Sequence, residues 1–245
     1  MSEPTMELRQ LFDPGSSTYS YLVWDHESHE AALIDPVEEQ VDRDIRLLRE
    51  LGLKLRYTLE THVHADHVTG SGILRNRLNS IVMVHENSHA KCADVLFRDG
   101  DMLPLGSSKI RVLSTPGHTD SDVSFMIPGA VFTGDALLIR GCGRTDFQSG
   151  DAGALFDSIT QQLFTLPDST IVYPGHDYQG RASSTIAEEK QHNPRLGTGI
   201  TRKEFIAIMN QLKLDPPVRM HEALPSNLRC GNEDSNTGQS SAFHW

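Results

Sequence analysis

Short apolar segments recur along the chain, each bounded by Gly, Pro, Asp or His, and this pattern predicts strands. Several segments are rich in aromatic and β-branched residues, as in the stretch YSYLVW that follows Thr18. The predicted strands are Tyr19–Trp24, Ala31–Ile34, Leu55–Glu60, Ile81–Val84, Ile110–Ser114, Val123–Ile127, Ala130–Thr133 and Thr170–Tyr173.

Between these strands, apolar residues fall at intervals of three and four, and this spacing predicts helices. In the clearest case Val41, Ile45, Leu48 and Leu51 share one face, and Gly52 ends the helix. The predicted helices span residues 41–51, 68–78, 152–164, 184–191 and 202–212. Because strands dominate each half of the chain and helices lie between them, the pattern favours an α/β sandwich of layers.

No internal repeat and no Gly-, Ser- or Pro-rich linker divides the chain. We therefore expect one catalytic domain over residues 1–230. The last part, residues 231–245, is polar and contains few apolar residues, so we expect a poorly ordered tail.

The composition is that of a folded protein. The chain has 245 residues, 38% of them hydrophobic, and is long enough to bury a core without disulfides. Its apolar runs are far shorter than the ~18 residues that a membrane span needs. The N-terminal residues lack a hydrophobic signal core and an Arg-rich transit pattern, so we expect a cytoplasmic location and no membrane partner.

Charge and cysteine content narrow the function classes. The chain has 22 Lys and Arg against 33 Asp and Glu, a net charge of −11, and no basic stripe. Such a chain repels a phosphate backbone, so we expect no nucleic-acid partner. Cys92, Cys142 and Cys230 lie far apart and form no CxxC motif, which favours reduced thiols in a reducing compartment over a disulfide framework.

The densest chemical signal is the stretch THVHADH, which places His62, His64, Asp66 and His67 within six residues directly after a predicted strand. Alternate residues in such a loop can point the same way, so several of these side chains can face one site. Imidazole and carboxylate are ligands for zinc, iron or manganese rather than calcium. A solvated His-rich loop is the simpler interpretation, but the density of the cluster favours a metal site.

Three further candidate ligands also follow predicted strands directly. They are His118 in the sequence PGH, Asp135 in TGD and His176 in PGH. A preceding glycine lets the backbone turn sharply toward a site. Any one of them alone would be structural more often than catalytic. Together with the THVHADH stretch they place candidate ligands at four strand ends, which predicts a metal site at one edge of the sheets.

The HxHxDH motif, followed by His118, Asp135 and His176 at strand ends, resembles the metallo-β-lactamase superfamily over about residues 6–212. The resemblance implies a four-layer αββα sandwich of the α+β/α/β class. It also implies a short C-terminal helical extension and a metal at the top of the two sheets.

A second motif narrows the resemblance. Residues 135–148, which read DALLIRGCGRTDFQ, closely resemble a segment of the persulfide dioxygenases of that superfamily. Shorter matches of the same kind occur at Ser16–Thr18, Ile34–Val37, Phe164–Pro167, Asn193–Leu196 and Arg229–Gly231.

This resemblance implies one ferrous iron per chain, bound by the catalytic residues His62, His118 and Asp135. Two histidines and one carboxylate leave three coordination positions open, which suits Fe(II) and O₂. The implied reaction oxidises glutathione persulfide with O₂ and water to sulfite and glutathione, as in sulfide detoxification. A homodimer is a further expectation, because the family often forms dimers.

The remaining ligand candidates allow two interpretations. Under the first, His64, Asp66, His67 and His176 orient the iron ligands and hold water. Under the second, they bind a second metal with Asp135 bridging, as in a thioester hydrolase of the glyoxalase II type. That type usually carries a longer C-terminal helical domain than follows His176 here, so the dioxygenase is favoured.

Four residues are candidates for substrate binding. Arg140 and Arg144 suit the carboxylates of glutathione, because Arg binds carboxylates bidentately; the alternative is an ion pair with Asp146 or a surface position. Cys142, between two glycines, is either a nucleophile with a lowered pKa or a small packing residue. Tyr178 either donates a hydrogen bond to substrate or packs beside the site.

Two local features qualify these predictions. The stretch from His85 to His89 matches HExxH, but His85 directly follows a predicted strand, so the imidazoles would not share the helix face that a zinc protease requires. After His118 and Thr119, Ser121 and Asp122 stand where the persulfide dioxygenases commonly have Gly and Cys. Asp122 thus adds a carboxylate near the proposed iron.

Overall fold

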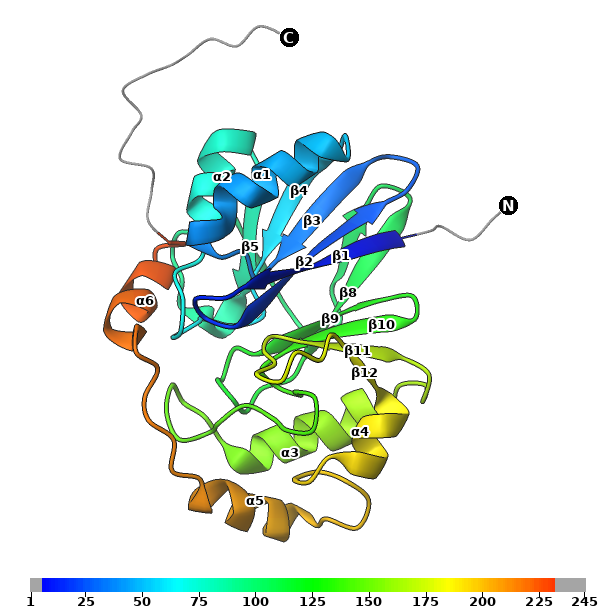
Figure 1. The fold of residues 1–245 in the computed structure, drawn as a ribbon, viewed down its shortest axis with the longest axis vertical. Helices are drawn as coiled ribbons and strands as arrows, with labels where there is room; N and C mark the ends of the chain where they lie inside the picture. The colour runs from blue at the N-terminus through cyan, green and yellow to red at the C-terminus, as the bar shows by residue number, and fades with distance from the viewer. Residues whose placement is uncertain (1–5, 232–245) are drawn as a thin grey trace, which may run out of the picture.

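Two mixed β-sheets lie face to face and carry helices on their outer surfaces (Figure 1). The computed structural model describes residues 6–231. Within that range the first sheet has the order β1-β2-β3-β4-β5-β6. Its strands are β1 (Met6–Asp13), β2 (Thr18–Asp25), β3 (Glu30–Ile34), β4 (Lys54–Leu59), β5 (Ile81–His85) and β6 (Val95–Phe97).

The second sheet has the order β12-β11-β10-β9-β8-β7. Its strands are β7 (Met102–Leu105), β8 (Ser108–Ser114), β9 (Val123–Ile127), β10 (Ala130–Gly134), β11 (Ile171–Pro174) and β12 (Ser184–Thr185). Most pairs are antiparallel, but β10 and β11 run parallel, as do β3, β4, β5 and β6. Parallel neighbours bring their carboxyl ends to the same edge of a sheet, so the residues that follow these strands lie close together.

Helices α1 (Val41–Glu50) and α2 (Ser71–Leu78) cover the first sheet. Helices α3 (Ala152–Gln161), α4 (Ile186–His192) and α5 (Arg202–Gln211) lie outside the second sheet. Helix α6 (Met220–Asn227) follows at the side of the molecule, beside the first sheet. Short 3₁₀ turns occur at Glu38–Gln40, Glu86–Ser88 and Leu163–Thr165.

The main core lies between the two sheets. Tyr21 of the first sheet packs against Phe132 of the second, with ring centroids 4.9 Å apart, and Phe97 packs edge-on against Phe125. The buried Tyr21 hydroxyl donates a hydrogen bond to the Pro174 carbonyl. All eight residues of β2 are buried, because β2 contacts the second sheet on one face and helices on the other. This explains the continuous apolar segment in the sequence.

The predicted four-layer αββα fold of the metallo-β-lactamase type is confirmed, and every predicted strand is present. Some boundaries were wrong. The helix expected over 68–78 begins at Ser71, the helix expected over 152–164 ends at Gln161, and residues 184–185 form a short strand ahead of α4. The tail predicted over 231–245 lies outside the described residues except for Gly231, and the single-domain boundary stays a prediction.

Besides β12 and the 3₁₀ turns, four of the described elements were not predicted: β1, β6, β7 and α6. Strand β1 is partly exposed and carries polar residues along its length, so its apolar periodicity is weak. Strands β6 and β7 span only three and four residues, too few to show a period. Helix α6 contains Pro225, which argues against a helix from sequence alone.

The HExxH stretch is not helical, as predicted. His85 is the last residue of β5, a 3₁₀ turn covers Glu86–Ser88, and His89 adopts a left-handed backbone with φ of 59°. The two imidazoles therefore do not share a helix face.

The expectation of three reduced cysteines is wrong. Cys92 and Cys230 form a disulfide across 138 residues, and Cys142 is the free cysteine among the described residues. Helix α6 brings Cys230 back to the loop that follows β5, where Cys92 lies. Sequence spacing carries no signal for a contact made by such a return of the chain.

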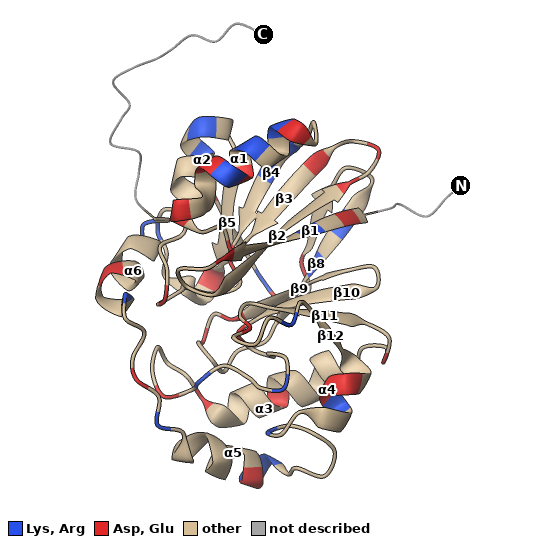
Figure 2. Cartoon of the chain, viewed as in Figure 1, with Lys and Arg blue, Asp and Glu red and all other residues tan. Residues whose placement is uncertain are grey.

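Lys and Arg positions, in blue, and Asp and Glu positions, in red, are interspersed along the helices (Figure 2). This distribution agrees with the absence of a basic stripe in the sequence. None of the helices within residues 6–231 is both long and apolar enough to cross a membrane.

The carboxyl group of Asp44 on α1 provides a pH-dependent contribution to stability. It is 2% exposed; Oδ1 accepts a hydrogen bond from Arg43, and Oδ2 has no partner in the described residues. Burial raises the pKa of Asp44 from 3.8 to about 6, although the Arg43 guanidinium lowers it. The folded protein therefore binds this proton more tightly than the unfolded chain does.

We predict that Asp44→Asn raises the free energy of unfolding at pH 7.5 by up to about 3 kcal/mol relative to wild type. The stabilising contribution of the protonated carboxyl is fully present below about pH 4 and is lost as the pH rises through about 6. Urea unfolding of both proteins at pH 4 and 7.5 measures this. An equal difference between variant and wild type at the two pH values would contradict the prediction.

Candidate metal centre

The loops that follow four strands meet at one edge of the two sheets. His62 follows β4 in the first sheet, whereas His118, Asp135 and His176 follow β8, β10 and β11 in the second. The predicted ligands thus come from both sheets and lie where the sheets face each other.

His62, His118 and Asp135 form a compact triad. Their potential ligand atoms all lie within 4.8 Å of one another, and His118 Nε2 is 3.7 Å from Asp135 Oδ2. Asp135 Oδ1 is buried and has no hydrogen-bond partner within residues 6–231. A buried carboxylate oxygen without a partner costs free energy. The residues present therefore fit a bound cation, and the family supports a metal here.

Hydrogen bonds at Nδ1 orient both imidazoles of this triad. His118 Nδ1 donates to the Arg144 carbonyl at 2.7 Å, and His62 Nδ1 donates to Thr61 Oγ1 at 3.0 Å. Each Nε2 then keeps its lone pair, as metal binding requires. Burial, with the neighbouring imidazoles of His64 and His118, holds the pKa of His62 well below its ordinary value. His62 is therefore neutral and able to act as a ligand.

The Asp35 carboxylate holds the start of the His-rich loop, residues 61–67, by hydrogen bonds. Oδ1 accepts hydrogen bonds from the Thr61 amide at 2.7 Å and from His64 Nε2 at 3.1 Å, and Oδ2 accepts one from Thr61 Oγ1 at 2.8 Å. The Thr61 hydroxyl in turn accepts from His62. Asp35 was not among the predicted site residues, although it lies in one of the matched segments, Ile34–Val37.

Residue 143, the second glycine of the GCG stretch, has no room for a side chain. Its amide donates to the Asp135 carbonyl at 2.7 Å. A Cβ atom at this position would lie 2.5 Å from that carbonyl oxygen and 2.9 Å from the His118 ring. A side chain at residue 143 would therefore displace two of the three triad residues.

The other predicted ligands lie beside the triad and form a second group. The ligand atoms of His64, Asp66 and His67 are within 4.8 Å of one another. Asp66 Oδ2 accepts hydrogen bonds from His67 Nδ1 at 2.9 Å and from Thr18 Oγ1 at 3.1 Å. His176 Nε2 lies 3.6 Å from both the Asp66 and Asp135 carboxylates.

His64 differs from His62 in the direction of its pKa shift. Burial alone would lower the pKa of His64, but the carboxylates of Asp35 and Glu60 raise it well above the ordinary value. His64 Nε2 lies 3.4 Å from Glu60 Oε2, in addition to its bond to Asp35. The structure thus brings together all seven predicted metal-site residues and places His64 on the carboxylate side of the loop.

A cavity of about 850 Å³ opens above the triad. Its walls include all three triad residues and the four predicted substrate-binding residues, Arg140, Cys142, Arg144 and Tyr178. Two of the predicted residues, Arg140 and Arg144, already have protein partners. Arg140 pairs with Glu189, and Arg144 forms a two-pronged ion pair with Asp146 at 2.6 and 2.7 Å.

Arg195 also lines this cavity and was not predicted. Its Nη1 donates to the Cys142 carbonyl at 2.9 Å, but within the described chain it forms no ion pair with a carboxylate. The other cavity arginines all do: Arg140, Arg144, Arg181 and Arg219 pair with nearby acidic residues. Arg195 lies in the matched segment NPRL, which was the signal that could have identified it.

Cys142 and Tyr178, the other two predicted substrate-binding residues, differ in burial: the Cys142 thiol is buried, whereas the Tyr178 ring is exposed. Burial raises the pKa of the Cys142 thiol to about 11, and its Sγ lies 3.7 Å from the Met209 sulfur. The thiol is therefore protonated at neutral pH, which favours the packing interpretation. The Tyr178 ring is exposed and stacks on His176 with centroids 6.0 Å apart. Its hydroxyl has no hydrogen-bond partner in the part of the chain described.

The additional carboxylate, Asp122, is buried and holds the turn after His118. Its two oxygens accept hydrogen bonds from the amide and the hydroxyl of Thr119 at 2.6 and 2.9 Å. Burial raises the pKa of Asp122 to about 6. The carboxylate lies 4.0 Å from His62 Nδ1, on the side away from the free Nε2, so it does not join the triad.

Known proteins share the sequence family and the fold of this chain. The family model described as "Metallo-beta-lactamase superfamily" matches residues 13–103 and 91–176. The chain therefore belongs to the metallo-β-lactamase superfamily. It is 47% identical over 226 residues to "Persulfide dioxygenase ETHE1, mitochondrial" of Homo sapiens, covering 91% of this chain and 88% of the relative. This identity places the chain in the persulfide dioxygenase family.

Two other comparisons bear on the site. The crystal structure of ETHE1 from Myxococcus xanthus superposes with a TM-score of 0.90 at 54% identity, covering 92% of this chain and all of that one. "Glyoxylase B2" of Dictyostelium discoideum is 29% identical and covers 88% of each chain. The dioxygenase relatives are thus markedly more similar than the glyoxylase.

We predict that Asp135→Asn, which keeps the size of the side chain but removes its charge, weakens metal binding by more than about tenfold. Metal content after loading and gel filtration, measured by mass spectrometry, tests this. Asp120→Asn is the matched control, because Asp120 is exposed. A full metal equivalent in the Asp135 variant would remove this residue from the ligand set.

Proposed function

We propose that this chain is a non-haem Fe(II) persulfide dioxygenase that oxidises glutathione persulfide with O₂ and water to sulfite and glutathione. The observation that carries the proposal is the triad of His62, His118 and Asp135 below an open cavity. Two imidazoles and one carboxylate leave open positions, the arrangement that suits non-haem iron and O₂. The persulfide dioxygenases at 47% identity support the same activity.

The iron, when bound, supplies the electron chemistry between O₂ and the terminal sulfur of the persulfide. In the overall reaction that sulfur gains three oxygens, two from O₂ and one from water. The sulfur–sulfur bond breaks, glutathione leaves as its thiol, and two protons are released with sulfite. The residues of this chain bind the metal and the substrate, and they provide positions for those protons.

The cavity suits glutathione in size and charge. Its volume of about 850 Å³ lies within the usual range of ligand pockets, roughly 300–1,000 Å³. Glutathione carries two carboxylates, and Arg195 offers a guanidinium that no carboxylate within residues 6–231 pairs. We therefore assign Arg195 as a carboxylate-binding residue, beside the earlier candidates Arg140 and Arg144, whose donors are largely taken. Tyr178, whose hydroxyl has no partner among the described residues, is the proposed donor to the rest of the substrate.

His176 is placed to hold a proton at the edge of the site. Its Nδ1 donates to the Ser17 carbonyl at 3.0 Å, which leaves Nε2 between the carboxylates of Asp66 and Asp135. With Asp66, which His67 holds by a hydrogen bond, it keeps the cavity wall polar beside the triad. We propose that His64, Asp66, His67 and His176 serve in this way rather than as ligands of a second metal.

The two-metal thioester hydrolase remains a second candidate because of one specific observation. His64 Nδ1 and His67 Nε2 are buried beside Asp66 and have no hydrogen-bond partner in the described residues. Against it stand the bond of His64 Nε2 to the Asp35 carboxylate and the lower identity to the glyoxylase relative.

We predict that the Fe(II)-loaded protein takes up O₂ when glutathione persulfide is added, with one sulfite formed per O₂. His62→Ala should lose both iron and turnover, because the triad loses a ligand. Asp66→Ala should keep one iron per chain, whereas a two-metal enzyme would lose half its metal. An oxygen electrode, a sulfite assay and metal analysis give these readouts. Hydrolysis of a glutathione thioester by the zinc form, without O₂ uptake, would favour the hydrolase.

We predict that Arg195→Met raises KM for glutathione persulfide about tenfold or more, with little change in kcat, because a charge-assisted hydrogen bond contributes about 1.5–3 kcal/mol. A persulfide without carboxylates should show no such increase. Arg144→Met is the comparison variant and should change KM less, since Asp146 already pairs with that guanidinium. A larger effect at Arg144 than at Arg195 would reverse the assignment.

The expected partners and location are part of the proposal. We retain glutathione persulfide as the small-molecule partner, a homodimer as the expected assembly, and no nucleic acid or membrane as a partner. A cytoplasmic location also stays a prediction, and the names of the mammalian relatives give a mitochondrial location for those proteins.

A further inference from the structure

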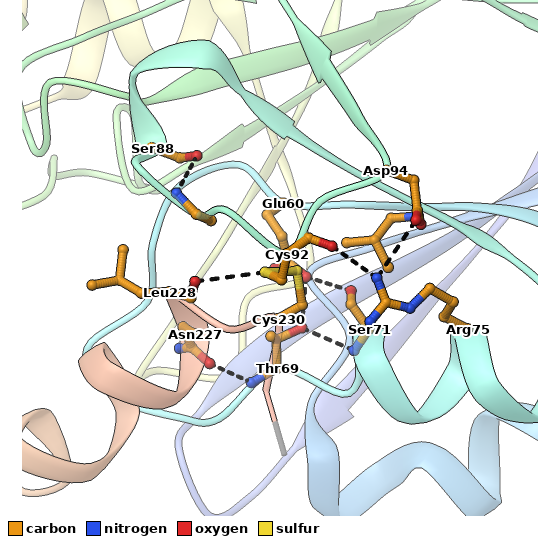
Figure 3. Close-up of a disulfide and its surroundings, with 12 residues drawn as sticks. Glu60, Thr69, Ser71, Arg75, Ser88, Cys92, Asp94, Asn227, Leu228 and Cys230 are labelled. Carbon is orange, nitrogen blue, oxygen red and sulfur yellow. Dashed lines mark hydrogen bonds and ion pairs between the residues drawn. A yellow bond between two sulfur atoms is a disulfide. The ribbon is translucent and has the colours of Figure 1, made fainter. Parts of the chain in front are cut away.

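The disulfide between Cys92 and Cys230 fastens the end of α6 to the loop that follows β5, close to Glu60 and Thr69 (Figure 3). Cys230 is 2% exposed, whereas Cys92 is partly exposed. A small molecule in solution can therefore reach this disulfide from the Cys92 side.

Helix α6 has little apolar packing to hold it in place. Its buried residues are Ala223, Ser226 and Asn227, which are small or polar, and none of them belongs to the hydrophobic clusters of the described chain. The segment between α5 and α6 runs along the side of the molecule, and its Val218 is 99% exposed. The position of α6 therefore depends on polar contacts and on the disulfide.

Those polar contacts reach the metal-binding loop. Asn227 Nδ2 donates to the carbonyls of His64 and His67, both at 2.8 Å, and Asn227 Oδ1 accepts from the Thr69 amide at 2.9 Å. One buried side chain of α6 thus ties down the backbone on which the predicted ligands stand.

The residues next to the disulfide continue this connection. The Cys230 carbonyl accepts from the Gly72 amide at 2.8 Å. Gly231 approaches so closely that a Cβ atom there would lie 2.0 Å from the Thr69 carbonyl, at a φ of +84° that favours glycine. The disulfide, α6 and the start of α2 therefore form one packed unit.

A path of side chains then leads to His64. The hydroxyls of Thr69 and Ser71 donate to Glu60 Oε1 at 2.6 and 2.5 Å, and Glu60 Oε2 lies 3.4 Å from His64 Nε2. His62, His64, Asn227 and Cys230 also line one small cavity of about 10 Å³. Cys230 thus lines the same small cavity as His62 and His64.

We propose that the Cys92–Cys230 disulfide is an exchange site for low-molecular-weight thiols such as glutathione, and that opening it releases α6 from the His62–His67 loop. The exchange site stands on the contacts above. Its effect on turnover rests on the function proposed for the metal centre, which itself releases glutathione as a product.

The chemistry needs only two molecules of thiol. The thiolate of the first attacks Cys92 Sγ, forms a mixed disulfide there and displaces the Cys230 thiolate, which takes a proton from water. The second thiol attacks the mixed disulfide, leaving Cys92 as a free thiol and releasing the small-molecule disulfide. Two thiols are oxidised and one protein disulfide is reduced.

The test equilibrates the full chain, with its disulfide intact, in buffers of increasing ratio of reduced to oxidised glutathione. Alkylation and peptide mass spectrometry report the state of Cys92 and Cys230, and amide hydrogen exchange reports residues 62–72 and 220–231. We expect both cysteines to become reduced. Amide exchange in both segments should rise by about tenfold or more, whereas α3 should stay unchanged.

Two variants separate the effect of the disulfide from the effect of the Asn227 hydrogen bonds. The double variant Cys92→Ser, Cys230→Ser should show fast exchange in both segments at every glutathione ratio. Asn227→Ala keeps the disulfide but should speed exchange in residues 62–72, because the two loop carbonyls lose their donor. Thermal unfolding of each variant shows whether the rest of the fold is intact.

Two results would overturn the proposal: a disulfide that stays closed in excess reduced glutathione, or one that opens while both segments exchange at the oxidised rate. O₂ uptake by the oxidised, Fe(II)-loaded protein is measured in parallel. Its absence would count against the dioxygenase function but would leave the exchange site intact. Uptake that falls as the disulfide opens would support both.

Discussion

The arrangement of the metal centre depends on the buried carboxylate of Asp35. It accepts three hydrogen bonds, from the amide and hydroxyl of Thr61 and from His64, and so determines where the His-rich loop leaves β4. Through the Thr61 hydroxyl it also sets which nitrogen of His62 faces the cavity. Asp35 itself adopts a left-handed backbone with φ of 50° directly after β3. A small acidic residue tolerates this conformation, which turns the chain under the loop.

The position of the site at one edge of the sandwich follows from strand topology. Four strands end at the same edge, and the residues that follow them are visible in the sequence as His62, His118, Asp135 and His176. Because strands of this kind have strong apolar patterns, the layers and the ligand set could be predicted from the chain alone. What the pattern left open was how the seven candidate residues divide between the triad and its neighbours.

Two features that the sequence could not supply depend on contacts in the folded chain. Whether Arg140, Arg144 or Arg195 can bind a substrate depends on its carboxylate neighbours, and among the described residues Arg195 is the one of the three without an ion pair. Cys92 and Cys230 meet because α6 crosses back to the first sheet, and α6 has neither the length nor the apolar period of a recognisable helix. The deciding partner lies far along the chain for Arg140 and for the disulfide, whereas Asp146, the partner of Arg144, is its near neighbour in sequence.

Helix α6 also affects the order in which the protein can be completed during synthesis. The His62–His67 loop emerges early from the ribosome, yet Asn227, which holds two of its carbonyls, is separated from His64 by 163 residues. A nascent chain that has already formed both sheets still lacks the side chain that steadies this loop. These two hydrogen bonds to the loop can form only after residue 227 has been synthesised, and a chain that ends before it would lack them.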